Sequence, residues 1–134
     1  IAVQPKTCRA GYNTAIVKDP DGDGFIVWLL APAPAAATIP VGGHYRIAVA
    51  ADGKTVERVD ALSASCLLIE KPKAVGDATP AMAFASHIVS PTPVETHVFL
   101  SLLYKLPLAV GTSATKEVWL VDKGRISKMD MGKK

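Results

Sequence analysis

Hydrophobic and polar residues alternate most clearly in the middle of the chain, between Pro40 and Cys66. Two β-prone runs flank Asp52-Gly53 there, and this pair accepts the positive φ angles that a two-residue hairpin loop requires. Such a loop places Val49 opposite Val56, so that the apolar side of one strand continues into the other. We therefore predict a β-hairpin over this stretch.

The first strand of this hairpin has a polar side, because side chains alternate between the two sides of a strand. Tyr45 and Ile47 share the apolar side, whereas His44 and Arg46 share the other. Arg46 comes within diagonal reach of Glu57, in a pair worth no more than about 1 kcal/mol when exposed. His44 and Arg46 are the residues that we expect to meet a partner.

Before the hairpin, the pattern predicts two strands and a loop. Residues 12–18 form a short strand, and residues 25–31 are apolar at every position, which is typical of a central strand covered on both sides. The segment 31–40 contains three prolines and no strand periodicity. This composition favours an extended loop.

After the hairpin, we predict a strand over residues 81–89 and a helix over about residues 93–105. Thr92 is the expected N-cap, Pro93 the first helical residue, and Glu95 completes a capping box. β-branched residues leave a strand as the alternative for this segment. At helical spacing, the apolar stripe expected to face the core comprises Val94, Val98, Phe99 and Leu102.

The last third of the chain returns to β structure, with strands at 106–111, 117–121 and 125–129 and a three-residue loop before the last of them. Strands on either side of one helix, mostly joined by tight turns, indicate an α+β domain rather than a βαβ array. We predict a single domain with one mainly antiparallel sheet of five to seven strands and the helix packed on it. Residues 1–11 and 130–134 are expected to be flexible.

Composition bears on partners more than on fold. Of the 134 residues, 20% are charged and 49% hydrophobic, and the mean hydropathy is +0.26. No apolar run approaches the roughly 18 residues that suggest a membrane-spanning helix, so the composition indicates an apolar surface used in a homo-oligomer or against a protein partner. A net charge of +3 with scattered Lys and Arg argues against a nucleic-acid partner.

Cys8 and Cys66 are the only cysteines, and they do not form a Cys-x-x-Cys pair. A disulfide between them adds about 4 kcal/mol in the chain-entropy description, and two separate buried thiols are the alternative. A disulfide indicates an oxidising compartment. The chain begins with Ile1, as expected after removal of a leader or shortening of the sequence, so we expect a periplasmic or secreted protein.

The segment DPDGDG matches the opening of a calcium-binding loop through Asp19, Asp21 and Asp23. The closing acidic ligand is missing, because Leu30 occupies the twelfth position. A calcium ion would need another carboxylate from elsewhere in the fold. The alternative is a charged turn in which the aspartates cap the backbone.

A second candidate metal site is a zinc site made of His44, His87, His97 and Glu95. Their spacing matches no zinc motif, and Glu95 and His97 would point to opposite sides of a helix. The alternative is that the histidines are partly buried and form hydrogen bonds within the fold. We expect no cofactor, with zinc or calcium as the alternatives.

Three blocks of sequence occur in an order that resembles a family of small, exported, uncharacterised bacterial proteins. They lie within residues 25–126 and read GGHYRIAVAADGKTVERVDALSASCL, HIVSPTPVETHVFLSL, and PLAVGT followed by VWLVDKGRI. The resemblance implies a Gram-negative periplasmic or envelope setting. It implies no activity, substrate or cofactor.

No catalytic arrangement is evident, because no serine lies in a G-x-S-x-G elbow and the acidic residues are scattered. We therefore expect a non-enzymatic exported domain that binds itself or another envelope protein. The alternative is a metal-binding protein or metal-dependent hydrolase that uses the histidines and Glu95.

Overall fold

A computed structural model describes residues 5–71 and 82–130, which form ten strands and one helix in three sheets. In chain order the elements are β1 Asn13–Lys18, β2 Phe25–Leu30, β3 Thr38–Pro40, β4 Tyr45–Val49, β5 Val56–Ala61, β6 Leu68–Glu70, β7 Ala83–His87, α1 Glu95–Tyr104, β8 Leu108–Thr112, β9 Glu117–Asp122 and β10 Arg125–Lys128. The α+β class is confirmed. The single sheet of five to seven strands is wrong.

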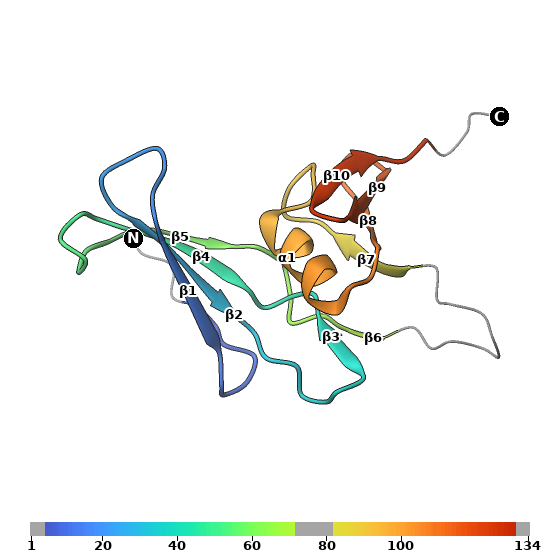
Figure 1. The fold of residues 1–134 in the computed structure, drawn as a ribbon, viewed down its shortest axis with the longest axis horizontal. Coiled ribbons are helices and arrows are strands. Elements are labelled where there is room, and N and C mark those ends of the chain that lie inside the picture. The colour runs from blue at the N-terminus through green and yellow to red at the C-terminus, as the bar shows by residue number, and fades with distance from the viewer. Residues whose placement is uncertain (1–4, 72–81, 131–134) are drawn as a thin grey trace.

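The N-terminal sheet has the antiparallel order β1-β2-β4-β5 and extends to one side of the molecule (Figure 1). Its strands come from two hairpins, β1–β2 and β4–β5, in which successive side chains point to opposite sides of the sheet. The central position of β2 is confirmed. The cover expected on both of its sides is not observed, because all six of its residues are only half-buried.

The hairpin of β4 and β5 pairs Val49 with Val56, as predicted, but its loop is longer than two residues. The Ala50 N–H donates to the Thr55 carbonyl at 2.8 Å, which leaves four residues in the loop. The Asp52 carboxylate accepts the backbone N–H groups of the two residues before β5 at 2.8 and 2.9 Å. These bonds favour the wider turn.

A β-bulge in β5 changes the partner of Arg46. The pairing register shifts between Ala48 and Val49, so that Glu57 is an extra residue on β5. Arg46 therefore lies opposite Asp60, with its Nε 3.2 Å from the carboxylate. The predicted pairing of Arg46 with Glu57 is wrong.

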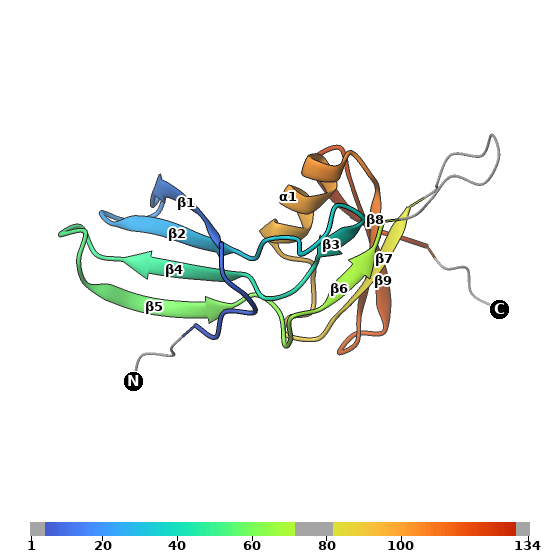
Figure 2. The same cartoon turned by 90° about the horizontal axis from the view of Figure 1, so that it is seen from below.

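The C-terminal sheet has the order β10-β9-β8-β7, and its strands β7 and β8 are parallel. Helix α1 connects these two strands, so this part of the chain is a βαβ unit (Figures 1 and 2). The prediction preferred antiparallel pairing to a βαβ array; one βαβ unit is present, and the other strand pairs are antiparallel. The turn between β9 and β10 contains two residues, Lys123 and Gly124, both with positive φ, rather than the predicted three.

The hydrophobic core lies between α1, the C-terminal sheet and the small antiparallel pair of β3 and β6. Its buried members are Ile39, Val41, Ala83, Ala85, Leu100, Leu108, Val110 and Val121. None of these lies in the N-terminal sheet. Strand β3 lies in the segment predicted as a loop, and it is held by pairing with β6 rather than by its own pattern.

No helix in residues 5–71 or 82–130 is long and apolar enough to cross a membrane.

Helix α1 begins two residues later than predicted, with Val94 rather than Thr92 as its N-cap. Of the expected apolar stripe, Val98 packs against the core, but Phe99 and Leu102 are exposed, whereas Leu100 and Ser101 are buried. A buried hydroxyl needs partners. The Ser101 Oγ lies 2.7 and 3.1 Å from two backbone carbonyl oxygens, so a polar residue occupies the inner side of the helix.

Candidate functional site

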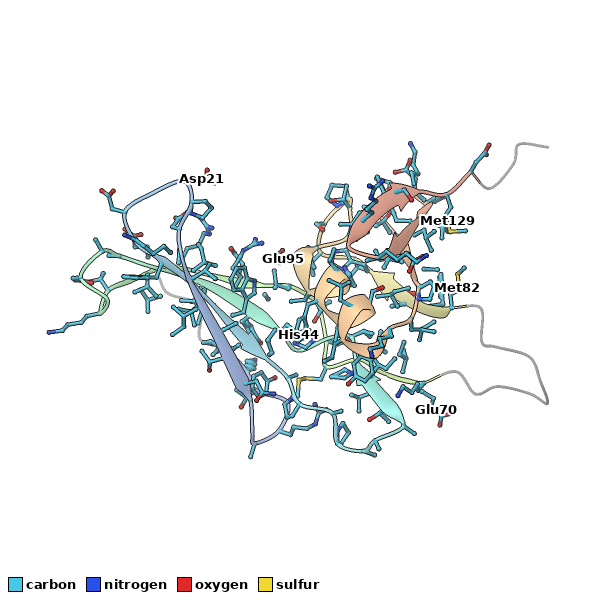
Figure 3. All side chains as sticks on the ribbon, in the orientation of Figure 1. Asp21, His44, Glu70, Met82, Glu95 and Met129 are labelled. Carbon is cyan, nitrogen blue, oxygen red and sulfur yellow. A yellow bond between two sulfur atoms is a disulfide. The ribbon has the colours of Figure 1, made fainter. Side chains whose placement is uncertain are left out.

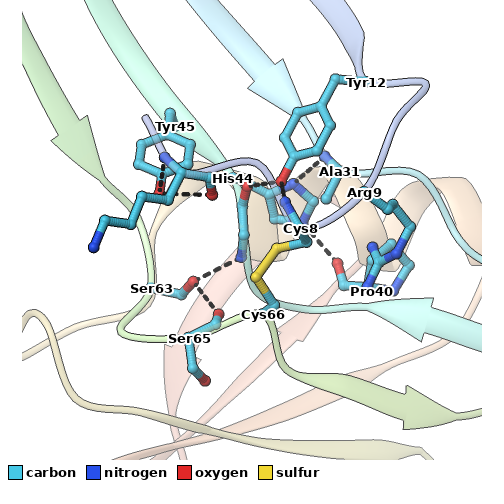
Figure 4. Close-up of a disulfide and its surroundings, with 12 residues drawn as sticks. Cys8, Arg9, Tyr12, Ala31, Pro40, His44, Tyr45, Ser63, Ser65 and Cys66 are labelled. Atoms are coloured by element: carbon cyan, nitrogen blue, oxygen red, sulfur yellow. Dashed lines mark hydrogen bonds between the residues drawn. A yellow bond between two sulfur atoms is a disulfide. The ribbon is translucent and has the colours of Figure 1, made fainter. Parts of the chain in front are cut away.

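A disulfide joins Cys8 to Cys66 and ties the start of the chain to the segment before β6 (Figure 4). The prediction of a disulfide is confirmed. The neighbouring Lys6 exchanges backbone hydrogen bonds with the Tyr45 hydroxyl, and Arg9 donates to the Pro32 carbonyl at 2.9 Å. The described part of the N-terminal segment, residues 5–11, is therefore held in place. The rest of the predicted flexible ends, 1–4 and 131–134, lies outside the described residues.

Gly43 is the point at which this segment meets the hairpin. The Tyr12 hydroxyl donates to the Gly43 carbonyl at 2.8 Å and accepts the Cys8 N–H at 3.0 Å. Gly43 has a φ of 90°, and a Cβ at this position would overlap the Cys8 Sγ. Both observations require glycine.

His44 lies between the two halves of the molecule, which are the N-terminal sheet and the C-terminal sheet with α1; we call this region the junction. Only 1% of the surface of His44 is exposed (Figure 3). Its Nδ1 accepts the Ala31 N–H at 3.0 Å, and its Nε2 donates to the Pro40 carbonyl at 2.6 Å. Burial lowers the pKa of His44, against the opposing effect of the Pro40 bond. Both ring nitrogens are thus used by the backbone, and the side chain does not reach the surface.

Arg46 links the N-terminal sheet to the start of α1. Its guanidinium lies 2.5 Å from Glu95 Oε2 and also pairs with Asp60. The Trp28 indole donates to the same Glu95 oxygen at 3.0 Å. Burial opposes ionisation of Glu95, but hydrogen bonds from its own backbone, Trp28 and Arg46 outweigh it and lower the pKa. Arg46 therefore holds the two halves together, and its surface is largely occupied.

His87 and His97 form the closest histidine pair, with ring centroids 4.9 Å apart and planes nearly perpendicular. The His97 Nδ1 accepts the Val94 N–H at 2.9 Å, which caps α1 and leaves the proton on Nε2. The Ser90 hydroxyl donates to the Thr92 carbonyl and so accepts the His87 Nε2–H at 2.7 Å. Burial, followed by repulsion from His87 and His44, lowers the pKa of His97 to about 4.

The four residues of the predicted zinc site share this junction but do not converge as metal ligands. Coordination requires an unprotonated ring nitrogen, and the hydrogen bonds leave none free on His44 or His97. The Glu95 oxygen Oε2 already accepts two side-chain bonds. Among the residues that the structure describes, no group of three or more His, Cys, Asp or Glu side chains is arranged to hold a metal ion.

The three aspartates of the calcium-like segment lie in the turn between β1 and β2, at the far end of the N-terminal sheet (Figure 3). The Asp19 carboxylate accepts the Asp21 N–H at 2.9 Å, and the Asp19 N–H donates to the Gly24 carbonyl at 2.9 Å. Asp21 and Asp23 are exposed. The geometry is that of a capped turn.

A cleft of about 240 Å³ separates the N-terminal sheet from α1. Trp28 and Leu30 line the sheet side, and Phe99 lines the helix side. Leu102 and Leu103 continue this apolar surface along the exposed side of the helix. The sequence did not predict this exposed apolar surface, because the helix buries a different stripe of residues from the one that its apolar spacing predicts.

The opposite side of the N-terminal sheet carries a second apolar surface, and we call it the open face. Its side chains stand in three rows across β1, β2, β4 and β5. The rows are Thr14-Leu29-Tyr45-Ala61, Ile16-Val27-Ile47-Val59 and Lys18-Phe25-Val49-Val56. All but Thr14 and Lys18 are apolar, and none of the twelve is buried. The alternation in β1, β4 and β5 is visible in the sequence, but it does not reveal that no other element within residues 5–71 and 82–130 covers this face.

Comparison with protein-family models, with curated proteins and with solved structures finds no match. The resemblance to exported bacterial proteins therefore stays a prediction.

Proposed function

We propose that this protein is a non-enzymatic, exported binding domain that recognises a protein surface through the open face. The observation that carries the proposal is the set of apolar side chains in three rows that no other described element covers. Isolated apolar residues are common on protein surfaces, but a contiguous apolar sheet face is typical of an interaction site.

The disulfide supports the exported setting, because such bonds persist in oxidising compartments. The polar clusters support a structural rather than catalytic role. His44 bonds backbone groups with both ring nitrogens, and Arg46 and Glu95 bond each other across the junction. The periplasm is the compartment that we propose.

Site-specific photo-crosslinking in cells that produce the protein tests this function. Ile16 and Val17 are neighbours on the edge strand β1, both are exposed, and they point to opposite sides of the sheet. Ile16→benzoylphenylalanine should give a protein adduct on irradiation, and Val17→benzoylphenylalanine should give little. Equal adducts at both positions, or none at position 16, would contradict binding through the open face.

A further inference from the structure

We propose that the surface recognised by the open face is the open face of a second copy, so that two N-terminal sheets stack into a two-layer β-sandwich. This inference rests on the proposed function and names its partner. A dimer of this kind has two-fold symmetry, in which each copy presents the same surface to the other.

Charge distribution favours a second copy over a charged partner. The open face carries one charge, on Lys18 at a corner of the third row. The charged residues Arg46, Arg58 and Asp60 lie on the other side of the sheet, where they pair with one another or with Glu95. A partner with charged groups would find only Lys18 to pair with on the open face, whereas an apolar face is complementary to itself.

The dimensions of the face suit a weak dimer. Four strands about 4.8 Å apart and six residues long cover roughly 400 Å² in projection. Two such faces, packed about 10 Å apart with strands within about 30° of each other, bury about 800 Å² in projection, which is below the roughly 1,200 Å² of stable interfaces and within the range of weak, transient ones. Lys6 lies at Tyr45 and borders one end of the face, so the second and third rows form the contact. We expect a dissociation constant of roughly 1–100 μM.

The edge of β5 is poorly suited to joining two sheets side by side. The bulge at Glu57 interrupts its ladder, and the charged residues Arg58 and Asp60 follow it on the side of the sheet opposite the open face. Bulges and charges at a sheet edge oppose the addition of another strand. The other edge, β1, carries no bulge, and pairing through β1 is therefore an outcome that the experiment must separate from stacking.

Sedimentation equilibrium of the purified protein tests the inference with a matched pair of variants. Ile16→Glu combined with Val56→Glu places a carboxylate at each margin of the open face, where 63% and 49% of the side chains are exposed. Val17→Glu is the control, because Val17 is 47% exposed on the other side of β1. Such exposed positions tolerate charge, and unchanged circular dichroism and melting temperature confirm that each variant folds.

The wild-type chain should approach twice its 14.1 kDa mass as its concentration rises. The double variant should raise the dissociation constant by at least about 100-fold, because carboxylates would be buried against an apolar face. The control should change it by less than about threefold. A wild-type monomer at about 1 mM, a dimer unaffected by the double variant, or equal loss in both variants as expected for pairing through β1, would overturn the inference. If the chain is monomeric but position 16 still cross-links to a different protein in cells, only the second copy is excluded and the proposed function stands.

Discussion

Individual polar residues between the N-terminal sheet and α1 stabilise the fold. His97 has 3% of its surface exposed, accepts the Val94 N–H and lies beside His87. A charge on its ring would be buried near another imidazole and near the positive end of the α1 dipole. The neutral ring is therefore the form that the folded protein favours.

Acid should destabilise the protein through His97. Its pKa is about 4 when folded and about 6.5 when unfolded, so the unfolded chain binds more protons between these values. Stability is present above the unfolded pKa and is lost as the pH falls toward the folded one. We expect the free energy of unfolding in urea to fall by about 2 kcal/mol from pH 7.5 to 5.0 because of this residue.

The variant His97→Gln should show a shallower dependence on pH over the same range. Part of the slope should remain, because burial also lowers the pKa values of His44 and His87. Equal stability of the wild-type protein at both pH values would contradict a buried neutral imidazole.

At the scale of elements, α1 is the most informative, because its inner side is not its most apolar side. Leu100→Ala should cost about 2–4 kcal/mol, since Leu100 is 3% exposed within the core. Leu103→Ala should cost less than about 0.5 kcal/mol, since 57% of Leu103 is exposed. Urea unfolding of the two variants measures both values. The reverse order would mean that the helix packs through its outer side.

Local sequence signals predicted most strands correctly, because hairpin strands depend on alternation and turn residues close to them. The same signals placed Val49 opposite Val56. The disulfide was predicted from the presence of only two cysteines, not from a local pattern. They failed where the partner is distant in sequence. Strand β3 contains Pro40 and exists through its pairing with β6, and β7 pairs in parallel with β8 only after the helix has returned the chain.

The predictions of the buried side of α1 and of the apolar interaction surface were wrong for the same physical reason: each depends on partners that the local sequence does not record. The hydroxyl of Ser101 can be buried because carbonyls from Leu106 and Val121 reach it, and no periodicity records such partners. The open face went unrecognised because the apolar composition of β2 indicates burial in general, and burial by another chain leaves the same pattern as burial by this one.

For the whole molecule, the disulfide is the main covalent constraint. It links positions 58 residues apart, and the N-terminal segment adds few buried contacts of its own. The double variant Cys8→Ser/Cys66→Ser should therefore lose about 4 kcal/mol of stability. Thermal unfolding with and without reductant measures the loss, and a thiol assay on denatured wild-type protein should detect no free thiol. A melting temperature that reductant does not change would contradict this role.

The pairing of β3 with β6 limits where the chain can be divided. Ile39 and Val41, which precede the β4–β5 hairpin, complete the core that β7, α1 and β8 build after it. A fragment that begins at residue 82 would keep the βαβ unit but lack Ile39 and Val41. Leu100 and Leu108 would then be exposed to water. The C-terminal half of the sequence is therefore not an independent module that can be transplanted or permuted, and Figure 1 shows β3 and β6 beside α1 and β7.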